Sequence, residues 1–403
     1  MIYTSKFKII DFVLRIMVKL ITLLICLYFS DNHNQKMNYL KSIVLEKREI
    51  KFPIYFPDAT RGVIRTLDSQ DLKEVGVEGV VVNSFHLMSE PGPTVIKSLG
   101  GIKKFMNWNG LVASDSGGFQ LLSLVYENKS FGKIDDNGIT FYRDSKGKKD
   151  RHVLTPEKSI QIQFSICADI MVCLDDCPSA KATNDENLLS VRRTIEWAKR
   201  SKDEFLKQIA NRKIIDKPFL FAVIHGADDK SLREKCANEL VKIGFDGFCF
   251  GGWPLNNERK LNQDILSFTA SLMPNNLPKF ALGVGNPKAI VDCVKIGYNI
   301  FDCVLPTRDA RHKRLYVFPK NPDDMDVFSE ENITDFVYIT DERYVRDPKP
   351  ISDYCDCHTC KNYSRSYLLH LFEIEDSLAG RLATIHNLRT YTKLIEVLRK
   401  NVQ

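Results

Sequence analysis

Eight short hydrophobic segments recur along the chain, and each is followed by polar or small residues. In order they are Pro53–Phe56, Gly79–Val82, Leu111–Ser114, Asp169–Leu174, Phe219–Ile224, Phe245–Phe250, Phe280–Leu282 and Tyr298–Phe301. Hydrophobic runs of this length, bounded by turn residues, are typical of buried parallel strands. Most are separated by helical patterns. The sequence therefore predicts an α/β fold, a (β/α)8 TIM barrel, with a doubly wound open sheet as the alternative.

The segments between these strands predict helices and one insertion. Thr155 and Pro156 form a cap and a first turn, so a helix should follow them. Further helices are predicted over 184–214, with a break, and over 229–243 and 287–296. Residues 128–152 are rich in glycine, lysine and aspartate, which predicts a hairpin insertion. We expect the barrel to span 37–315 and a zinc-binding subdomain, packed on the barrel, to span 316–403.

The first 36 residues form a hydrophobic extension. The uncharged run Leu20–Phe29 is too short to span a membrane, and no small-residue cleavage site follows it. We therefore expect an upstream extension before Met37, with a signal sequence as the alternative, and a membrane partner is not expected. Most of the 11 cysteines stand singly in apolar context, which favours a reducing compartment and a cytoplasmic location.

A cysteine cluster near the C-terminus predicts a metal site. Cys355, Cys357 and Cys360 lie within six residues, and His386 follows after a stretch with a helical pattern. Three thiolates and an imidazole make a tetrahedral Cys3His site for Zn²⁺. Because protein groups fill all four positions, the zinc should be structural. A redox pair and ligation by His358 are the alternatives.

Four aspartates follow predicted strands and compete for catalytic roles: Asp115, Asp175, Asp176 and Asp302. In a TIM barrel the carboxyl ends of the strands meet at the active-site face, so these carboxylates should converge. A carboxylate there can serve as nucleophile, general acid/base or reader of a base edge. The glycine pairs 117–118 and 251–252 allow a ligand to approach the backbone closely.

A basic segment and a missing motif narrow the substrate class. Residues 306–314 place several positive side chains directly after Asp302, which suits a phosphate-rich substrate. The net charge of +6 permits a nucleic-acid partner without demonstrating one. No Walker loop or Rossmann fingerprint is present, so no nucleotide cofactor is indicated.

Together these features resemble the tRNA-guanine transglycosylases, from about Phe52 to Leu398. The motifs that carry the resemblance are, in order, Val82–Leu87, Ser114–Gln120, Leu174–Cys177, Phe245–Gly247, Gly251–Gly252, Leu282–Gly285, Phe301–Arg308 and the Cys3His cluster. The resemblance implies an enzyme that exchanges guanine at the tRNA wobble position for a 7-deazaguanine. Its implied partners are tRNA, the free 7-deazaguanine base and a second copy of the chain in a homodimer.

The resemblance also implies roles for individual residues. Asp302 matches the nucleophile that forms a covalent intermediate with the ribose, Asp115 the general acid/base, and Asp175 the carboxylate that reads the base. The remaining matches are base and supporting contacts at Asn83, Ser116, Phe119, His225, Gly251, Gly252 and Leu282, and RNA contacts at Arg308 and Arg311.

Some positions depart from the family pattern. His225 stands where the family usually has glutamine, and its imidazole can still donate to a base carbonyl. Asn257 stands where a glutamate is usual, and Trp253 and Leu255 add bulk nearby. We therefore expect a small neutral 7-substituent rather than a cationic one. A relative acting on DNA and a non-catalytic RNA-binding subunit are the alternative functions.

Overall fold

The computed structural model describes residues 39–45, 48–145, 148–210, 217–256 and 258–402. Tyr39–Gln403 forms one compact unit. The predicted extension 1–36 lies outside the described residues. Among the helices that are described, none is long and apolar enough to cross a membrane.

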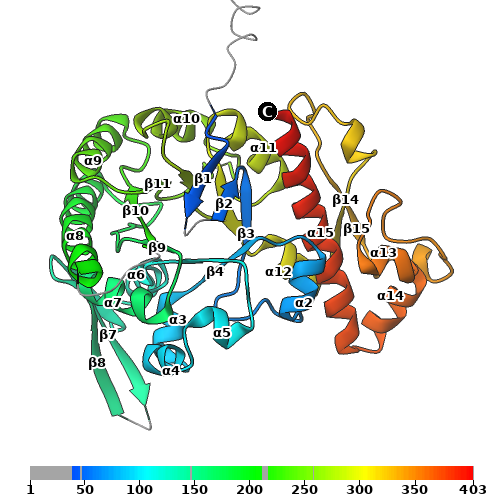
Figure 1. Ribbon diagram of the computed structural model, residues 1–403, viewed down its shortest axis with the longest axis horizontal. Helices are drawn as coiled ribbons and strands as arrows, with labels where there is room; N and C mark the ends of the chain where they lie inside the picture. Colours follow the sequence, from blue (N-terminus) through cyan, green and yellow to red (C-terminus); the bar gives the residue numbers. More distant parts are fainter. Residues whose placement is uncertain (1–38, 46–47, 146–147, 211–216, 257, 403) are drawn as a thin grey trace, which may run out of the picture. The chain divides into compact units, whose positions relative to one another are not determined.

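Eight parallel strands form the centre of this unit (Figure 1). They are β3 (Ile54–Pro57), β4 (Gly79–Val82), β5 (Leu111–Ser114), β9 (Ile170–Val172), β10 (Phe219–Ile224), β11 (Gly247–Phe250), β12 (Lys279–Ala281) and β13 (Ile300–Cys303). Their hydrogen-bonded order is β3-β13-β12-β11-β10-β9-β5-β4. A parallel bridge between Asp58 and Val81 joins the two ends of this sheet. The predicted barrel is therefore confirmed over the open sheet.

Large aromatic side chains fill the barrel interior. The rings of Phe56 and Phe280 meet edge to face, with centroids 6.4 Å apart. Position 79 has no room for a side chain, because a Cβ there would lie 2.3 Å from the Phe56 ring. The interior below the site is thus closely packed, which fixes the strand ends that carry the polar residues.

Helices surround the barrel, and the predicted ones are present (Figure 1). Thr155 caps α7 (Pro156–Ile166), and Asp229 caps α9 (Lys230–Ile243). The predicted break in the long helix is wrong as far as the structure describes it, because α8 runs without interruption over Asn184–Ala210. The others are α2 (Ser69–Glu74), α3 (Ser84–Ser89), α4 (Pro93–Ser98), α5 (Ile102–Met106), α6 (Gly118–Glu127), α10 (Gln263–Leu272), α11 (Pro287–Lys295) and α12 (Leu305–Arg311).

The predicted insertion is a small antiparallel sheet of β6 (Gly132–Asp135), β7 (Gly138–Ser145) and β8 (Lys148–Leu154). It contains one strand more than the hairpin predicted, and β7 and β8 extend away from the barrel in Figure 1. The indole N–H of Trp197 on α8 donates to the Asp136 carbonyl at 2.9 Å and anchors the base of this sheet. A second hairpin, β1 (Ser42–Leu45) with β2 (Arg48–Lys51), precedes the barrel.

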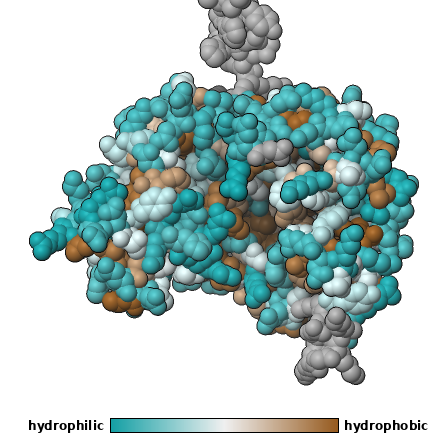
Figure 2. Space-filling view, turned by 180° about the vertical axis from the view of Figure 1, so that it is seen from behind, coloured by the Kyte–Doolittle hydropathy of each residue, from teal (hydrophilic) through white to brown (hydrophobic). Residues whose placement is uncertain are grey.

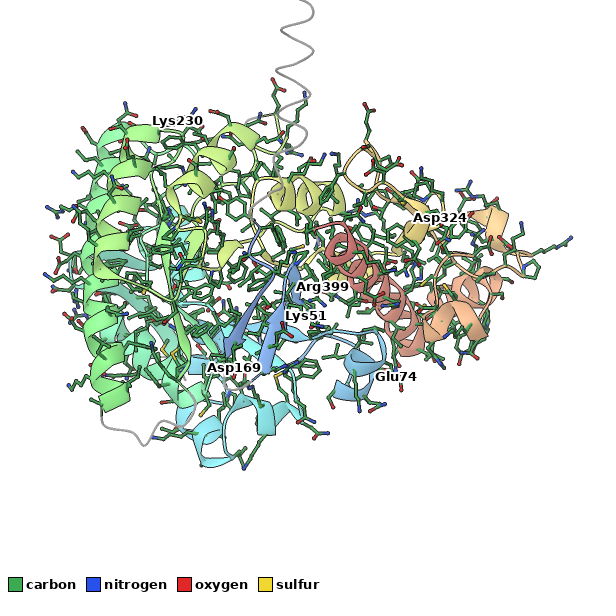
Figure 3. The ribbon with its side chains drawn as sticks, turned by 45° about the horizontal axis from the view of Figure 1, so that its top comes forward. Lys51, Glu74, Asp169, Lys230, Asp324 and Arg399 are labelled. Carbon is green, nitrogen blue, oxygen red and sulfur yellow. The ribbon has the colours of Figure 1, made fainter. Side chains whose placement is uncertain are left out.

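The C-terminal elements lie on one side of the barrel in Figure 1. They are β14 (Arg314–Val317), β15 (Asp335–Tyr338), the 3-10 helices η1 (Pro322–Asp324) and η2 (Glu342–Tyr344), α13 (His358–Asn362), α14 (Arg365–Glu373) and α15 (Ser377–Asn401). Arg399 on α15 donates to the carbonyls of Lys51 and Pro53, at 2.8 and 2.9 Å, and lies beside Lys51 in Figure 3. The Tyr391 hydroxyl donates to the Gly285 carbonyl at 2.7 Å. Helix α15 therefore packs directly on the barrel.

Candidate active site

Asp302 is the last residue but one of strand β13, at the carboxyl face of the barrel. Its Oδ1 accepts the backbone N–H of Gly283 at 2.9 Å. The neighbouring Cys303 carbonyl accepts the Tyr55 hydroxyl at 2.7 Å, which fixes the end of the strand. Burial raises the pKa of Asp302 to about 6, the Gly283 N–H lowers it, and the negative charge of Asp58 raises it further. The Gly283 N–H thus holds the Asp302 carboxylate, and Asp302 as a whole residue is partly buried.

Asp115 follows strand β5 and is held more tightly. Its Oδ1 accepts the N–H groups of Ser84 and Gly117 at 2.8 and 3.0 Å, and its Oδ2 accepts the Asn83 amide. Burial raises the pKa of Asp115 to about 7, the two backbone donors lower it, and the charges of Asp302 and Asp58 raise it. Asp115 and Asp302 therefore interact electrostatically and differ in proton affinity.

Asp175 and His225 form a buried pair next to these acids. The His225 Nε2 lies 2.7 Å from the Asp175 Oδ2, and the Ser116 hydroxyl donates to Oδ1 at 3.4 Å. His225 is 2 % exposed. In this arrangement the imidazole that we expected to contact a base is bonded to the carboxylate expected to read the same base. A base that takes a hydrogen bond from the His225 Nε2 must displace Asp175 from that nitrogen.

Gly251 and Gly252 allow close approach to this pair. A Cβ at position 251 would lie 2.6 Å from the His225 Nε2, and Gly252 has a φ of +98°. Arg233 lies behind them, and its guanidinium donates to the carbonyls of Ala227, Ile224 and Gly251. Gly251 therefore makes room for the His225 ring, and the approach of a ligand to this backbone stays a prediction.

A cavity of about 70 Å³ is lined in part by His225. Its lining includes Gly252, Trp253, Leu255 and Asp228. The Asp228 carboxylate, which the sequence analysis missed, accepts the Asn262 amide at 2.9 Å. Asn257, the position of the missing glutamate, lies outside the described residues. The carboxylate of Asp228, which no sequence motif indicated, therefore lines this cavity.

Aromatic side chains stand at the rim of the site. Phe119 lies in the first turn of helix α6 and is 53 % exposed, and its ring centroid lies 5.9 Å from that of Trp253. Leu282, the other residue expected to sandwich a base, follows β12 and is partly exposed. In the face shown in Figure 2, a hollow with hydrophobic residues opens amid a hydrophilic surface. Phe119 contacts an aromatic partner on the β11 loop, which the sequence did not predict.

Asp176, the fourth candidate aspartate, has a separate set of partners on α6 and α8. It is 1 % exposed, and its carboxylate pairs with Arg193 on α8 at 3.2 Å. The same side chain accepts the Tyr126 hydroxyl, and its backbone N–H donates to the Thr194 hydroxyl. These partners make Asp176 a structural residue that holds α8 against the barrel.

Basic residues follow Asp302 on helix α12. Arg308 is exposed, and Arg311 donates to the Thr307 carbonyl at 2.8 Å. Burial lowers the pKa of Arg311, the positive charge of Arg65 lowers it further, and the negative charge of Asp58 opposes both. Arg65 and Asp58 therefore also face this part of the site. The sequence analysis assigned neither, because neither stands in one of its motifs.

The cysteine cluster assembles as predicted. The ligand atoms of Cys355, Cys357, Cys360 and His386 all lie within 4.8 Å of one another. The His386 Nε2 lies 2.7 Å from the Tyr316 carbonyl, which requires a proton on Nε2 and leaves Nδ1 facing the thiols. Donor type, number and spacing all fit a tetrahedral metal ion.

One family model and several known proteins match most of this chain in sequence. The family model described as queuine tRNA-ribosyltransferase covers residues 39–403. A protein of Caldanaerobacter subterraneus with that name is 36% identical over 354 residues, 88% of this chain and 87% of the relative. Proteins with the same name from Shewanella sediminis and Staphylococcus aureus are 36% and 35% identical. These two alignments cover 90% and 87% of this chain, and 89% and 85% of the respective relative.

Proposed function

Because this chain belongs to the queuine tRNA-ribosyltransferase family, we propose that it is a tRNA-guanine transglycosylase that exchanges guanine at the wobble position for a 7-deazaguanine. Members of this family are pentosyltransferases. The observation that carries the proposal is the meeting of Asp302, Asp115 and the Asp175–His225 pair at one barrel mouth. An inert RNA-binding subunit would not need all three carboxylates.

The two acids divide the chemistry. The Asp302 carboxylate attacks C1′ of the ribose, the bond from C1′ to guanine N9 breaks, and Asp115 gives its proton to the departing guanine. The incoming base then gives its N9 proton to Asp115, and its N9 attacks C1′ and releases Asp302. Burial raises the pKa of Asp115 to about 7 and that of Asp302 to about 6, which favours a proton on Asp115 and an ionised Asp302, the state that this reaction needs.

Other residues bind the base and the RNA. Asp175 accepts from the base edge, and His225 donates to the base carbonyl once the two have separated. Gly251 and Gly252 supply backbone contact. Phe119 and Leu282 pack on the faces of the base. Ser116 holds the Asp175 carboxylate in place, and Asn83 holds that of Asp115. Arg308 and Arg311 bind phosphates of the RNA.

Zn²⁺ is the metal that best suits the cysteine cluster. Cys355, Cys357, Cys360 and His386 would hold it and leave no open position, so it serves the fold rather than the reaction. The family resemblance adds a homodimer to the proposal, which light scattering tests. Among the ten cysteines that the structure describes, none forms a disulfide bond, in keeping with the cytoplasmic location that we propose.

Exchange of labelled guanine tests the proposal. The purified chain should incorporate labelled guanine into tRNA carrying guanine at the wobble position, and not into the same tRNA with adenine there. Incorporation into DNA alone would replace the proposal with a DNA-modifying activity. Binding of tRNA without incorporation would replace it with the non-catalytic subunit.

A further inference from the structure

A further carboxylate, that of Asp58, shares the barrel mouth with Asp302 and Asp115. Phe56 points into the barrel, where its ring meets Phe280. Side chains alternate along a strand, so Asp58, two residues further on, lies on the same inner face. Phe56 is the register partner of Asp302 on β13, and Asp58 is bridged to Val81 on β4. Asp58 therefore stands between the strand that carries Asp302 and the strand that leads to Asn83.

The carboxylate of Asp58 is fixed but not neutralised. The backbone N–H of Thr60 donates to its Oδ1 at 3.1 Å, and the Thr60 hydroxyl donates to the same atom. Within the described ranges, no cation lies close enough to Asp58 to form an ion pair. Its second oxygen is thus free of cationic partners, and its negative charge acts on the groups around it.

Three charged groups from three parts of the barrel face Asp58. Asp302 lies on β13, Asp115 follows β5, and Arg311 lies on α12. Arg65, from the loop after β3, and Arg308 reach Arg311 from either side. Tyr55 on β3 faces Asp302 and donates to the Cys303 carbonyl. Arg308 and Arg311 lie on α12 and Arg65 in the loop after β3, so Asp302 and Asp115 are the two acids that act with Asp58 at the strand ends.

We propose that Asp58 is a positioning residue for the exchange reaction, whose negative charge sets the pH range in which Asp115 and Asp302 share one proton. This inference rests on the function proposed above. Burial alone raises the proton affinity of both acids, and the charge of Asp58 adds to that effect at each. Asp58 thereby moves the productive state, with Asp302 ionised and Asp115 protonated, from acidic toward neutral pH.

Replacing the charge tests this role directly. Asp58→Asn keeps the size of the side chain and an oxygen for Thr60 while removing the charge, and Asp58→Ser is a second neutral variant. A negative charge in the same site raises the pKa of a neighbouring carboxyl by on the order of half a pH unit or more. The pH profile of kcat/KM for guanine exchange should therefore shift to lower pH by about that amount in both variants. Asp335→Asn, on exposed β15, serves as the control and should leave the profile in place.

Carboxyl NMR of ¹³C-aspartate-labelled full chain gives a second measurement that does not need activity. Signals of Asp115 and Asp302, assigned with Asp115→Asn and Asp302→Asn, should titrate at lower pH in Asp58→Asn than in the parent. Unchanged titration, or lower activity with an unshifted profile, overturns the inference and leaves Asp58 a structural residue. If the parent shows this effect of Asp58 on the two acids but exchanges no guanine, the proposed function is refuted, and so is the role of Asp58 in the reaction. The electrostatic effect of Asp58 on Asp115 and Asp302 would still be established.

Discussion

Asn387 on α15 donates its side-chain amide to the backbone carbonyl of Pro306 on α12 at 3.0 Å. The preceding residue, His386, belongs to the cysteine cluster, and Pro306 lies four residues after Asp302. The same amide also donates to the Arg314 carbonyl, at 3.0 Å. One turn of α15 therefore connects the metal site to the helix that carries Arg308 and Arg311.

The first prediction concerns the metal. The parent should contain one zinc per chain, and Cys357→Ser should lose it and lower the free energy of unfolding by about 3 kcal/mol or more. Guanine exchange by the fraction that remains folded should change less. Cys167→Ser, at an exposed cysteine outside the cluster, is the matched control and should keep its zinc. Metal analysis with denaturant unfolding measures both, and a metal-free chain of full stability would refute this account.

The second prediction concerns the pH dependence of stability. The pKa of an aspartate in an unfolded chain is about 3.9, whereas burial raises the pKa of Asp115 to about 7. Between these values the folded protein holds more protons than the unfolded chain, so stability falls as the pH rises through this window.

Asp115→Asn cannot titrate at this position and should lose less stability than the parent between about pH 4 and about pH 8. Because Asp115 is partly exposed, we expect a difference on the order of 1 kcal/mol. Urea unfolding at several pH values measures it. Equal loss in the parent and the variant would show that Asp115 has an ordinary proton affinity in the folded state.

Much of the fold could be predicted from the sequence. Each barrel strand is a short hydrophobic run because parallel strands are buried on both faces. The spacing of Cys355, Cys357 and Cys360 predicted a metal cluster because donor type and spacing suffice to define such a site. In both cases the signal is local, so one stretch of chain contains it.

The rest depends on contacts between distant segments. Asp175 and Asp176 are adjacent in sequence, yet one faces His225 and the other pairs with Arg193 on α8. Asp58 and Asp228 reach the site through loops after β3 and β10, and each resembles an ordinary turn aspartate in the sequence. These two aspartates reach the site only because the barrel closes, and no local sequence pattern predicts their place in it.

The third prediction concerns the RNA contacts on α12. Arg308→Ala and Arg311→Ala should each weaken tRNA binding and reduce the slope of log K against log salt by about 1, because each removes one phosphate contact. Lys242→Ala, on the exposed side of α9, is the control and should keep the parent slope. Binding measured at several salt concentrations decides this, and unchanged slopes would place the RNA elsewhere.

The fourth prediction concerns the incoming base. The preference for a small neutral 7-substituent stays a prediction. Asp228 lines the same cavity as His225, and its carboxylate could instead favour a cationic substituent. Competition among free bases with nitrile, aminomethyl and cyclopentenediol substituents measures the preference. If Asp228 binds a cationic substituent, the parent should favour the aminomethyl base, and Asp228→Asn should reduce that preference about tenfold. If the parent favours the nitrile, Asp228→Asn should change little.

The covalent role of Asp302 is the central claim, and trapping the intermediate tests it most directly. The parent, mixed with tRNA, should give a protein–RNA adduct that survives denaturation. Asp302→Ala should give no adduct while binding tRNA about as well as the parent, since phosphate contacts position the RNA. An adduct of undiminished yield in Asp302→Ala would contradict the assignment of Asp302 as the nucleophile.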